Sequence, residues 1–375
     1  MSGQSSLRVG MVVEQLWQPV PGGSGVYIEE LLAELATGAH GVDVTGLAAR
    51  HAGPPPAQPL PPGLAVRHAP LPRTVLYESW QRVGHPRAEA VAGPLDVVHA
   101  TTWAVPPTRR PLVVTVHDVA FLHDPTHFTA RGNAWFRRAL ERTRRSADAV
   151  IVPSQATADD CLAVGLDAAR VHVVPHGSRP VPRTAAQVAD FRDRTGLGRP
   201  YVLWCGTIEP RKNLPVLLRA FASVADRRPD LDLVLVGPAG WGEVPGHPAG
   251  LAPDRVRVLG RLSREDLHSA YAGAAAFCFP SVREGFGLPV LEAMQHGLPV
   301  VTSAGTACAE VAGGAALLVD PASPADLADA LVEATGPAAP DLARRSAERA
   351  ADFSWRRSAA TTADVYRSVA GRRSG

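Results

Sequence analysis

Short apolar runs of five to seven residues alternate with amphipathic stretches from one end of the chain to the other. The runs in the first half are Leu7–Val13, Val42–Gly46, Leu95–His99, Leu112–His117, Ala149–Pro153 and Val171–Pro175. Those in the second half are Tyr201–Gly206, Leu231–Gly237, Val256–Gly260, Ala275–Pro280, Pro299–Ser303 and Ala316–Asp320. Runs with so few polar interruptions predict strands buried on both faces, which is typical of parallel sheets covered by helices.

The stretches between these runs have the spacing of amphipathic helices. One helix is predicted between Val26 and Leu35, and its apolar face carries Ile28, Leu31, Leu32 and Leu35. Another follows the strand Tyr201–Gly206, with Leu217, Leu218, Phe221 and Val224 at the same spacing. Strand–helix alternation of this kind predicts an α/β fold.

Two sets of strands predict two Rossmann-like domains, each with a doubly wound parallel sheet. The polar, proline-bearing segment Ser178–Arg183 separates the sets. We therefore expect an N-terminal domain over residues 1–180 and a C-terminal domain over 181–354. A helix in residues 355–375 follows the second set and can pack back on the N-terminal domain.

The composition is that of a soluble globular protein, with 375 residues, 46% hydrophobic residues and a formal net charge of +2. Basic and acidic residues nearly balance in each half, 17 and 16 in residues 1–190 and 21 and 20 in 191–375. This balance argues against a nucleic-acid-binding tail. The four cysteines form no CxxC pair, which predicts reduced thiols and a cytoplasmic protein. The first apolar run is too short for a signal peptide or a membrane span.

Lysine occurs once, at Lys212, among 38 basic residues. An ammonium is a compact point charge and a guanidinium is a wide planar fork, so a lone lysine in an arginine-rich chain suggests a place where arginine does not fit. Arg211 and Lys212 follow the strand Tyr201–Gly206, and Asn213 can cap the next helix. Two cations at a helix start predict a phosphate site. A solvated basic turn is the alternative.

Glycines gather in Pro21–Gly25, between the first strand and the first helix. Glycines let the backbone approach a phosphate, and a helix N-terminus attracts the anion. The dinucleotide fingerprint is incomplete, because Ile28 stands at its third glycine position, and no Walker lysine is present. An NAD-dependent dehydrogenase is therefore disfavoured, and a plain tight turn explains this loop as well as a phosphate site does.

The segment Pro280–Met294 combines two carboxylates, two glycines and a first-turn proline. Glu284 precedes the turn and Glu292 lies one turn into the helix, so both carboxylates can reach one pocket. Ionised carboxylates only accept hydrogen bonds, which suits the hydroxyls of a ribose or a sugar. Gly285 and Gly287 leave nearby backbone amides able to face a ligand.

Together these segments resemble glycosyltransferase family 4. The resemblance rests on Glu284-x7-Glu292 with Gly-Phe-Gly-Leu-Pro between, on Gly22-Gly23-x-Gly25, on Arg211-Lys212, on Gly297-x-Pro299-Val300-Val301 and on the segment from Glu310 to Pro321. His117-Asp118 with Phe121-Leu122, and Gly206-Thr207-x-Glu209-Pro210, are similar to bacterial mannosyltransferases of polysaccharide assembly. The family implies the GT-B architecture, in which two Rossmann-like domains face a cleft. It also implies a nucleotide-sugar donor, retention of anomeric configuration, and no metal or other cofactor.

The resemblance also implies roles for individual residues. Lys212 would neutralise the donor diphosphate, helped by the Gly22–Gly23 backbone of the N-terminal domain. Glu292 would accept from the ribose, while the donor sugar or its β-phosphate would contact Glu284 and the amides of Phe286, Gly287 and Leu288. Thr207 stands where many relatives have arginine, which weakens the second phosphate contact unless Arg211 supplies it. The acceptor side of the N-terminal domain would comprise Gly25, Trp103, His117 and Asp118, with core packing as the alternative for Trp103.

The catalytic candidates are His117, Lys212 and Glu284. Breaking a glycosyl–phosphate bond builds negative charge on the leaving diphosphate, so preorganised cations and amides lower the barrier. If the acceptor attacks from the leaving-group side, the departing phosphate oxygen can take the proton, and no protein base is required. His117 as a base or hydrogen-bond donor is a second hypothesis, and a core histidine is the third.

The interpretation is a retaining, metal-independent transferase of a hexose to a glycan, lipid-linked or small-molecule acceptor. Mannose from GDP-mannose is favoured over a UDP-sugar only by the subfamily resemblance. A disaccharide phosphorylase and a non-catalytic sugar-binding protein are the alternatives. The phosphorylase would be one without pyridoxal phosphate, because that cofactor needs a Schiff-base lysine and Lys212, the sole lysine, is assigned to phosphate. Arg131–Arg145 can contact an anionic membrane, with a solvated helix face as the alternative. Asp230-x-Asp232 resembles a metal-binding DxD, but it lies at the amino end of a strand, where a solvated turn is expected.

Overall fold

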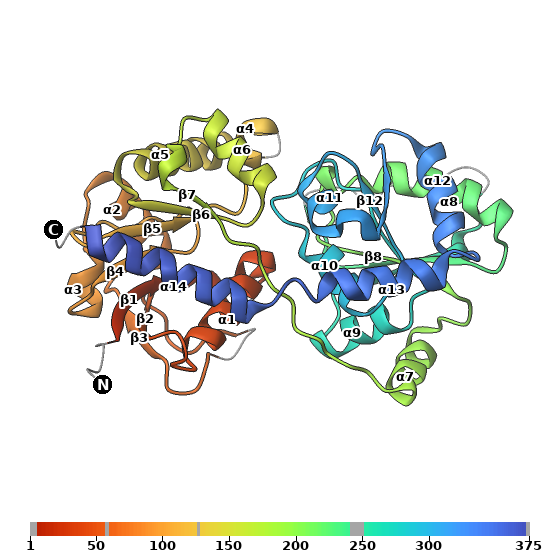
Figure 1. Cartoon of the computed structure of the whole chain (residues 1–375), viewed down its shortest axis with the longest axis horizontal. Coiled ribbons are helices and arrows are strands. Elements are labelled where there is room, and N and C mark those ends of the chain that lie inside the picture. The colour runs from red at the N-terminus through yellow and green to blue at the C-terminus, as the bar shows by residue number, and fades with distance from the viewer. Residues whose placement is uncertain (1–5, 57–59, 126–127, 241–250, 373–375) are drawn as a thin grey trace. The chain divides into compact units, whose positions relative to one another are not determined.

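The computed structural model describes residues 6–56, 60–125, 128–240 and 251–372, and the chain forms two compact units (Figure 1). The first unit comprises Met1–Gly177 and Ser354–Gly375, and the second comprises Ser178–Phe353. The chain leaves and re-enters the first unit at one place, because a Cβ on Gly177 would lie 2.1 Å from the backbone nitrogen of Trp355. Only glycine fits so close an approach of two backbone segments.

The first unit has a seven-stranded parallel sheet in the order β3-β2-β1-β4-β5-β6-β7. Its strands are β1 (Leu7–Val12), β2 (Val42–Ala48), β3 (Ala65–His68), β4 (Val97–Ala100), β5 (Leu112–Thr115), β6 (Ala149–Val152) and β7 (Val171–Val173). Its helices are α1 (Gly22–Leu35), α2 (Arg73–Arg82), α3 (Ala88–Ala92), α4 (Ala120–His123), α5 (Ala130–Ser146), α6 (Gln155–Ala163) and α14 (Trp355–Arg372). The last helix, blue in Figure 1, packs against α1 and against β4 and β6.

The second unit has a six-stranded parallel sheet in the order β10-β9-β8-β11-β12-β13. Its strands are β8 (Tyr201–Cys205), β9 (Asp232–Val236), β10 (Val256–Gly260), β11 (Ala276–Phe279), β12 (Val300–Ser303) and β13 (Leu317–Val319). Its helices are α7 (Ala185–Thr195), α8 (Leu214–Arg227), α9 (Arg264–Ala272), α10 (Leu288–Gln295), α11 (Ala307–Ala312), α12 (Pro324–Ala334) and α13 (Ala339–Ala350).

The predicted fold class is confirmed, and each of the twelve predicted strands is present. Strand β3 was missed because its exposed Arg67 and His68 break the apolar pattern, as is common for an edge strand that pairs on one side only. The predicted helix faces are buried as expected. In α8, for example, Leu217, Phe221 and Val224 are fully buried, and each such side chain stabilises the fold by about 1.5–3 kcal/mol.

In both sheets the strand order reverses beside the first strand of the unit. The reversal lies between β1 and β4 in the first sheet and between β8 and β11 in the second. In open α/β sheets, ligands bind at the carboxyl ends of the strands that flank such a reversal. The topology therefore points to the segments that follow β8 and β11, and to those that follow β1 and β4.

Two local predictions were wrong. The glycines of Pro21–Gly25 do not form a loop ahead of the helix, because α1 begins at Gly22 and these residues make its first turn. Asn213 has a left-handed backbone (φ 61°), and its side chain makes no capping hydrogen bond to α8. Among the described helices, none is both long and apolar enough to cross a lipid bilayer.

Candidate active site

The segments after β8 and β11 meet in a cluster of four charged side chains in the second unit. Lys212 Nζ lies 2.5 Å from Glu284 Oε1, and Arg211 Nη1 lies 2.8 Å from Glu284 Oε2. Arg211 Nε in turn donates to Glu209 Oε2 at 2.8 Å. Glu284 thus joins the two cations that the sequence analysis singled out, across 72 residues of chain.

Glu284 is ionised at neutral pH. Burial raises the pKa of its carboxyl, but the charges and hydrogen bonds of Lys212 and Arg211 outweigh burial and hold that pKa at about 2. With Glu209 included, two carboxylates face two cations, so the cluster is close to neutral. A buried charge is tolerated when it is paired in this way.

Lys212 is 6% exposed, and its Nζ lies 4.6 Å from the centroid of the Phe279 ring. The ammonium therefore lies between a carboxylate and an aromatic face, and an ammonium on a ring face is itself favourable. A guanidinium is wider than an ammonium, so this enclosed position explains why lysine stands here in an arginine-rich chain.

Asn213 fixes the cluster to its surroundings. Its Nδ2 donates to the carbonyl of Pro280 at 3.1 Å and to that of Pro321 at 2.7 Å. These bonds connect the turn after β8 with the segments that follow β11 and β13. Asparagine tolerates the left-handed region better than most residues, so Asn213 links three loops where the sequence analysis expected a helix cap.

Gly287 is the N-cap of α10 and has φ of 98°. A Cβ at this position would lie 2.7 Å from Cys308 Sγ, so both the backbone conformation and the space require glycine. The Leu288 amide opens the helix and has no acceptor within it. Phe286, which precedes the helix, is buried edge-on against Phe353. The predicted loop thus carries a helix N-terminus four residues after Glu284.

Glu292 is positioned by Tyr271, a residue that the sequence analysis did not identify. The buried Tyr271 hydroxyl donates to Glu292 Oε2 at 3.0 Å. Cys205, the last residue of β8, adjoins both groups, and burial followed by the Glu292 charge raises the pKa of its thiol to about 12. Thr207 is half-buried just beyond this strand.

In the first unit, His117 follows β5 and its Nε2 lies 2.9 Å from the carbonyl oxygen of Thr101. A carbonyl only accepts, so Nε2 carries the hydrogen and Nδ1 keeps a lone pair. Burial lowers the pKa of His117, and the imidazole is neutral at pH 7. The edge of the Tyr27 ring lies against it, with the ring centroids 5.0 Å apart.

A buried hydrogen-bond chain supports Tyr27. The Tyr27 hydroxyl and Thr115 Oγ1 are 2.9 Å apart, Thr115 Oγ1 lies 2.8 Å from His99 Nε2, and His99 Nδ1 lies 2.6 Å from the Tyr366 hydroxyl. The chain joins α1, the sheet and α14. Burial lowers the pKa of His99 to about 3, so this histidine is also neutral.

The remaining acceptor-side candidates have structural contacts. Gly25 is buried within α1, and Asp118 Oδ1 accepts from the Ala120 amide at 3.0 Å. Trp103 is 8% exposed and packs edge-on against Phe121, which favours the packing alternative.

A second cluster at the carboxyl edge of the first sheet was missed. Glu14 is 1% exposed, and its carboxylate accepts from the Ala49 amide at 2.7 Å and lies 2.9 Å from His51 Nε2. Trp17 stacks on His51, with the ring centroids 4.8 Å apart and the planes at 9°. The sequence offered one indication of this cluster, because Glu14 is the acidic residue that ends the first apolar run.

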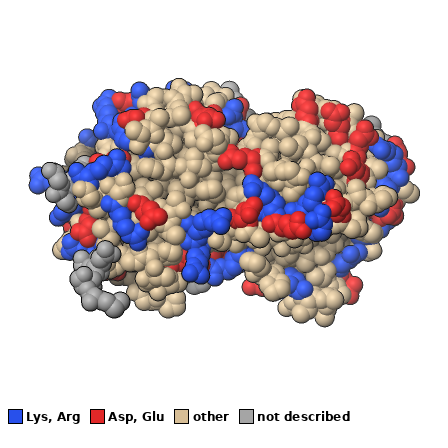
Figure 2. Space-filling view, in the orientation of Figure 1, with Lys and Arg blue, Asp and Glu red and all other residues tan. Residues whose placement is uncertain are grey.

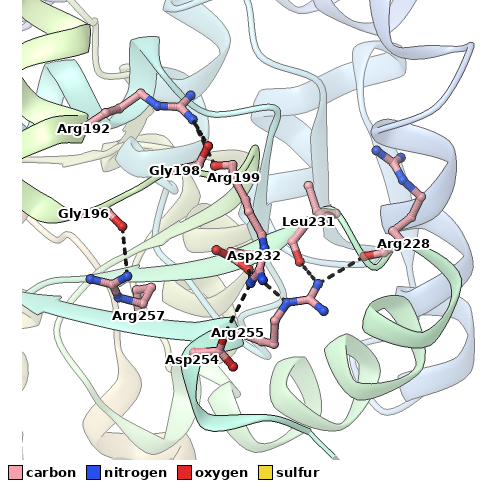
Figure 3. Close-up of polar contacts among 10 residues, drawn as sticks. All are labelled: Arg192, Gly196, Gly198, Arg199, Arg228, Leu231, Asp232, Asp254, Arg255 and Arg257. Atoms are coloured by element: carbon pink, nitrogen blue, oxygen red, sulfur yellow. Dashed lines mark hydrogen bonds and ion pairs between the residues drawn. The ribbon is translucent and has the colours of Figure 1, made fainter.

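Two predicted surface features have partners within the protein. Asp232 is buried rather than solvated, and at the amino end of β9 it pairs with Arg255 at 3.0 Å and Arg199 at 3.2 Å (Figure 3). Within Arg131–Arg145, Arg142 donates to the Trp80 carbonyl and Arg145 pairs with Glu141. These contacts satisfy part of the charge of this helix, and membrane contact stays a prediction.

Comparison with known proteins identifies the family. The model of "Glycosyltransferase Family 4" matches residues 21–179, and that of "Glycosyl transferases group 1" matches residues 199–335. A D-inositol 3-phosphate glycosyltransferase of Salinispora tropica is 33% identical, over 92% of this chain and 80% of its own length. The chain belongs to glycosyltransferase family 4. Another family relative, an O-antigen chain mannosyltransferase B of Escherichia coli, is 32% identical over 64% of this chain and 66% of its own length.

Solved structures agree on the GT-B fold. A sucrose-phosphate synthase of Thermosynechococcus elongatus has a TM-score of 0.74 and 23% identity, and the match covers 98% of this chain and 100% of that one. The HepE protein of Anabaena in complex with UDP-glucose has a TM-score of 0.69 and 20% identity, covering 98% and 99%. At this identity the likeness concerns the fold alone. The family membership makes the chain a glycosyltransferase.

Proposed function

We propose that this glycosyltransferase is retaining and metal-independent, and that it transfers a hexose from a nucleotide-sugar donor bound by the second unit. The observation that carries the proposal is the Lys212–Glu284–Arg211 cluster at the strand-order reversal of the second sheet. A diphosphate is the ligand whose charge matches paired cations beside a helix N-terminus.

Lys212 has donors to spare for a phosphate. An ammonium has three hydrogens, and among the described residues Nζ makes one hydrogen bond, to Glu284. A donor diphosphate can therefore share the ammonium with Glu284, which keeps Lys212 oriented before the donor arrives. As the glycosyl–phosphate bond breaks, charge grows on the leaving oxygen, and a cation already in place stabilises it without reorganisation.

The first unit would bind the acceptor. His117 offers a lone pair at Nδ1, because Thr101 holds the hydrogen on Nε2. That lone pair would accept from a second hydroxyl of the acceptor and so orient it, while the attacking hydroxyl gives its proton to the departing phosphate oxygen on the same side of the sugar. Such a same-side step gives retention of configuration. His117 as the base itself is the second route, and its lowered pKa suits either role, since both need a neutral ring.

For the donor we favour GDP-mannose, on the likeness to the E. coli mannosyltransferase, and a UDP-sugar is the rival. For the acceptor we favour a glycan or lipid-linked sugar on the same likeness. Inositol 3-phosphate is the second candidate, because relatives named for it align over most of this chain.

A thermal-shift screen against GDP-, UDP- and dTDP-sugars, each with and without EDTA, tests the donor site. We expect one nucleotide class to raise the Tm in EDTA as much as without it. The stabilising donor is then incubated with inositol 3-phosphate or with a mannosylated glycan, and NMR of the product gives the anomeric configuration. An inverted product, or stabilisation lost in EDTA, would refute the proposal.

Two outcomes would favour the alternatives that the sequence analysis retained. Stabilisation by free phosphate together with phosphate-dependent cleavage of a disaccharide would indicate a phosphorylase. Stabilisation by a free sugar, with no turnover of any donor, would indicate a sugar-binding protein.

A further inference from the structure

A cavity of about 390 Å³ lies at the amino edge of the first sheet. Five arginines line it together with a single acidic residue, and they are Arg110, Arg142, Arg145, Arg170 and Arg372, with Asp148 as the acid. In the space-filling view, basic side chains gather over the end of the first unit at which α14 finishes (Figure 2). His117 and α1 belong to the opposite, carboxyl edge of the same sheet, so this cavity is distinct from the proposed active site.

The five arginines come from separate parts of the unit. Arg110 precedes β5, Arg170 precedes β7, and Arg372 ends α14. Arg142 and Arg145 lie in the last turns of α5. The strands and helices bring them together although 262 residues separate Arg110 from Arg372 in the sequence. A solvated face of one helix cannot account for such an arrangement.

Acidic partners satisfy only part of this charge. Arg145 pairs with Glu141 at 2.6 Å and Arg170 with Asp167 at 3.3 Å. Arg170 also donates to the carbonyls of Arg144 and Ala147. Asp148 accepts from the Leu112 amide at 2.8 Å, which holds its carboxylate at the start of β5.

The other three arginines are less well satisfied. Among the described residues, neither Arg110 nor Arg372 forms an ion pair; Arg110 acts on Asp96 only at longer range, and that carboxylate pairs with Arg8 at 2.7 Å. Within residues 6–372 as described, Arg372 donates to Ser368, a neighbour on its own helix. Arg142 Nη1 donates to the Trp80 carbonyl at 2.7 Å, but its Nε is buried without a hydrogen-bond partner in the described part of the chain. A buried donor without an acceptor is unfavourable.

At the amino edge of the second sheet, arginines are paired with groups of the fold itself. There, Arg255 and Arg199 share Asp232, and Arg199 also reaches Asp254 at 3.4 Å (Figure 3). Arg257 donates to the carbonyls of Gly196 and Thr195. Each of these guanidinium groups has carboxylate or carbonyl acceptors within the fold, whereas no described residue of the first unit accepts from the Arg110 guanidinium or from Arg142 Nε.

We propose that this cavity binds a small multivalent phosphate, such as pyrophosphate or the phosphate group of a metabolite. A guanidinium presents its donors in a planar fork that matches phosphate oxygens, and several arginines around one cavity compensate a charge of −2 or more. Bound there, the anion would connect α14 through Arg372 to α5 through Arg142 and to the start of β5 through Arg110. The site would therefore stabilise the docking of the C-terminal helix on the first unit, and it needs no role in the transfer reaction.

Calorimetric titration of the full chain with pyrophosphate tests the site, with sulfate and chloride at equal ionic strength as anion controls. The double variant Arg110→Gln/Arg372→Gln removes the two arginines that lack acidic partners. The matched control is Arg131→Gln/Arg356→Gln, which removes exposed arginines of α5 and α14 outside the cavity. We expect binding in the wild type and the control, and a loss of roughly tenfold or more in affinity for each arginine removed from the cavity.

Lys212→Ala separates this site from the donor site, since pyrophosphate could also bind the second unit. The proposal requires Lys212→Ala to retain the binding that the cavity variant loses. The converse result, loss in Lys212→Ala and retention in the cavity variant, would overturn it and assign the phosphate to the donor site. Equal binding of sulfate and pyrophosphate would also overturn it, as would binding to phosphatidylglycerol vesicles in the absence of any response to pyrophosphate.

Discussion

At the carboxyl edge of the second sheet the groups that face each other are ionised, whereas the His117 and Tyr27 rings that face each other beside β5 in the first sheet are neutral. Lys212, Arg211 and Glu284 form a buried ion-pair cluster. His117 and Tyr27 lie in an apolar setting in which burial lowers the pKa of the imidazole and raises that of the phenol. Two sheets with the same parallel architecture thus present different chemistry, and the proposed function assigns the charged donor to one and the acceptor hydroxyl to the other.

The difference comes from which residues follow the strands compared, which are β8 and β11 in the second sheet and β5, the neighbour of β4, in the first. β8 is followed by Glu209, Arg211 and Lys212, and β11 by Glu284, so charges of both signs meet at one reversal of strand order. β5 is followed by His117, whose only hydrogen-bond partner in the described part of the chain is a backbone carbonyl. The fold supplies the location, and the residues at the strand ends decide the chemistry.

The largest effect is expected from Lys212→Ala, which removes the charge that the comparison depends on. We expect kcat/KM to fall by roughly 10²–10³, because a preorganised cation no longer stabilises the leaving diphosphate. Lys212→Arg keeps the charge but places a wider group against Phe279, so we expect it to restore less than about tenfold of this loss. If kcat/KM of Lys212→Ala stayed within threefold of wild type, the claim that Lys212 stabilises the leaving diphosphate would be wrong.

Gly287→Ala tests whether the start of α10, beside the ion-pair cluster, requires glycine. The added Cβ would lie 2.7 Å from Cys308 Sγ, and the alanine would have to keep the backbone φ of 98°. We expect a loss of about 2–3 kcal/mol in the free energy of unfolding, measured by urea denaturation. Gly287→Ala/Cys308→Ala relieves the contact but not the backbone strain, so it should be less unstable than the sum of the two single changes. If the losses in unfolding free energy of the two single variants summed to that of the double variant, the contact between the added Cβ and Cys308 Sγ would be refuted.

Glu284→Gln keeps the shape of the side chain and removes the charge that orients both cations. We expect donor affinity to fall by roughly tenfold to a hundredfold, since Lys212 and Arg211 would repel each other without it. The readout is the KM for the donor across pH 4 to 8. Because the pKa of Glu284 is about 2, the wild type should show no titration of this group in that range. A wild-type acid limb near pH 4.5 that the variant lacks would contradict the assignment.

His117→Ala tests whether the neutral imidazole of the first unit contacts the acceptor. We expect roughly a tenfold rise in the KM for the acceptor and little change in the KM for the donor, because the imidazole would contact only the acceptor. Trp103→Phe is the control, since Trp103 is buried against Phe121. It should lower the Tm and leave both KM values close to those of the wild type. If His117→Ala raised only the KM for the donor, the assignment of His117 to the acceptor would be wrong.

A further prediction concerns the pH dependence of stability, which acts below neutral pH and leaves stability at pH 7 nearly unchanged. Burial lowers the pKa of His99 from 6.5 to about 3, so below pH 6.5 the unfolded chain binds a proton that the folded chain does not. Stability should then fall as the pH falls, by up to about 1.4 kcal/mol for each pH unit between those two values. His99→Gln should flatten the decline of Tm between pH 7 and 5. An unchanged slope would show that folding does not lower the pKa of His99.

Much of the fold was predictable because it depends on local patterns. Strands buried on both faces read as continuous apolar runs, and twelve of them were found in this way, whereas the exposed edge strand β3 has no such pattern. The residues of the charged cluster were also predictable, since Lys212 is the only lysine and Glu284 lies in a distinctive loop.

The contacts within the sites were less predictable, because they join residues far apart in the sequence. Nothing near Tyr271 indicates that its hydroxyl binds Glu292, and the pairing of Glu14 with His51 spans 37 residues. Asn213 was misjudged for a similar reason. Its side chain satisfies carbonyls 67 and 108 residues away, and those contacts outweigh its local preference for a helix cap.

The most direct test of the account is calorimetric titration of GDP-mannose and UDP-glucose, in EDTA, into the wild type, Lys212→Ala and His117→Ala. The account predicts that one donor binds the wild type, that His117→Ala binds it with nearly the same affinity, and that Lys212→Ala binds it at least tenfold more weakly. Equal affinity in Lys212→Ala, or a loss confined to His117→Ala, would contradict the claim that the charged edge of the second sheet binds the donor.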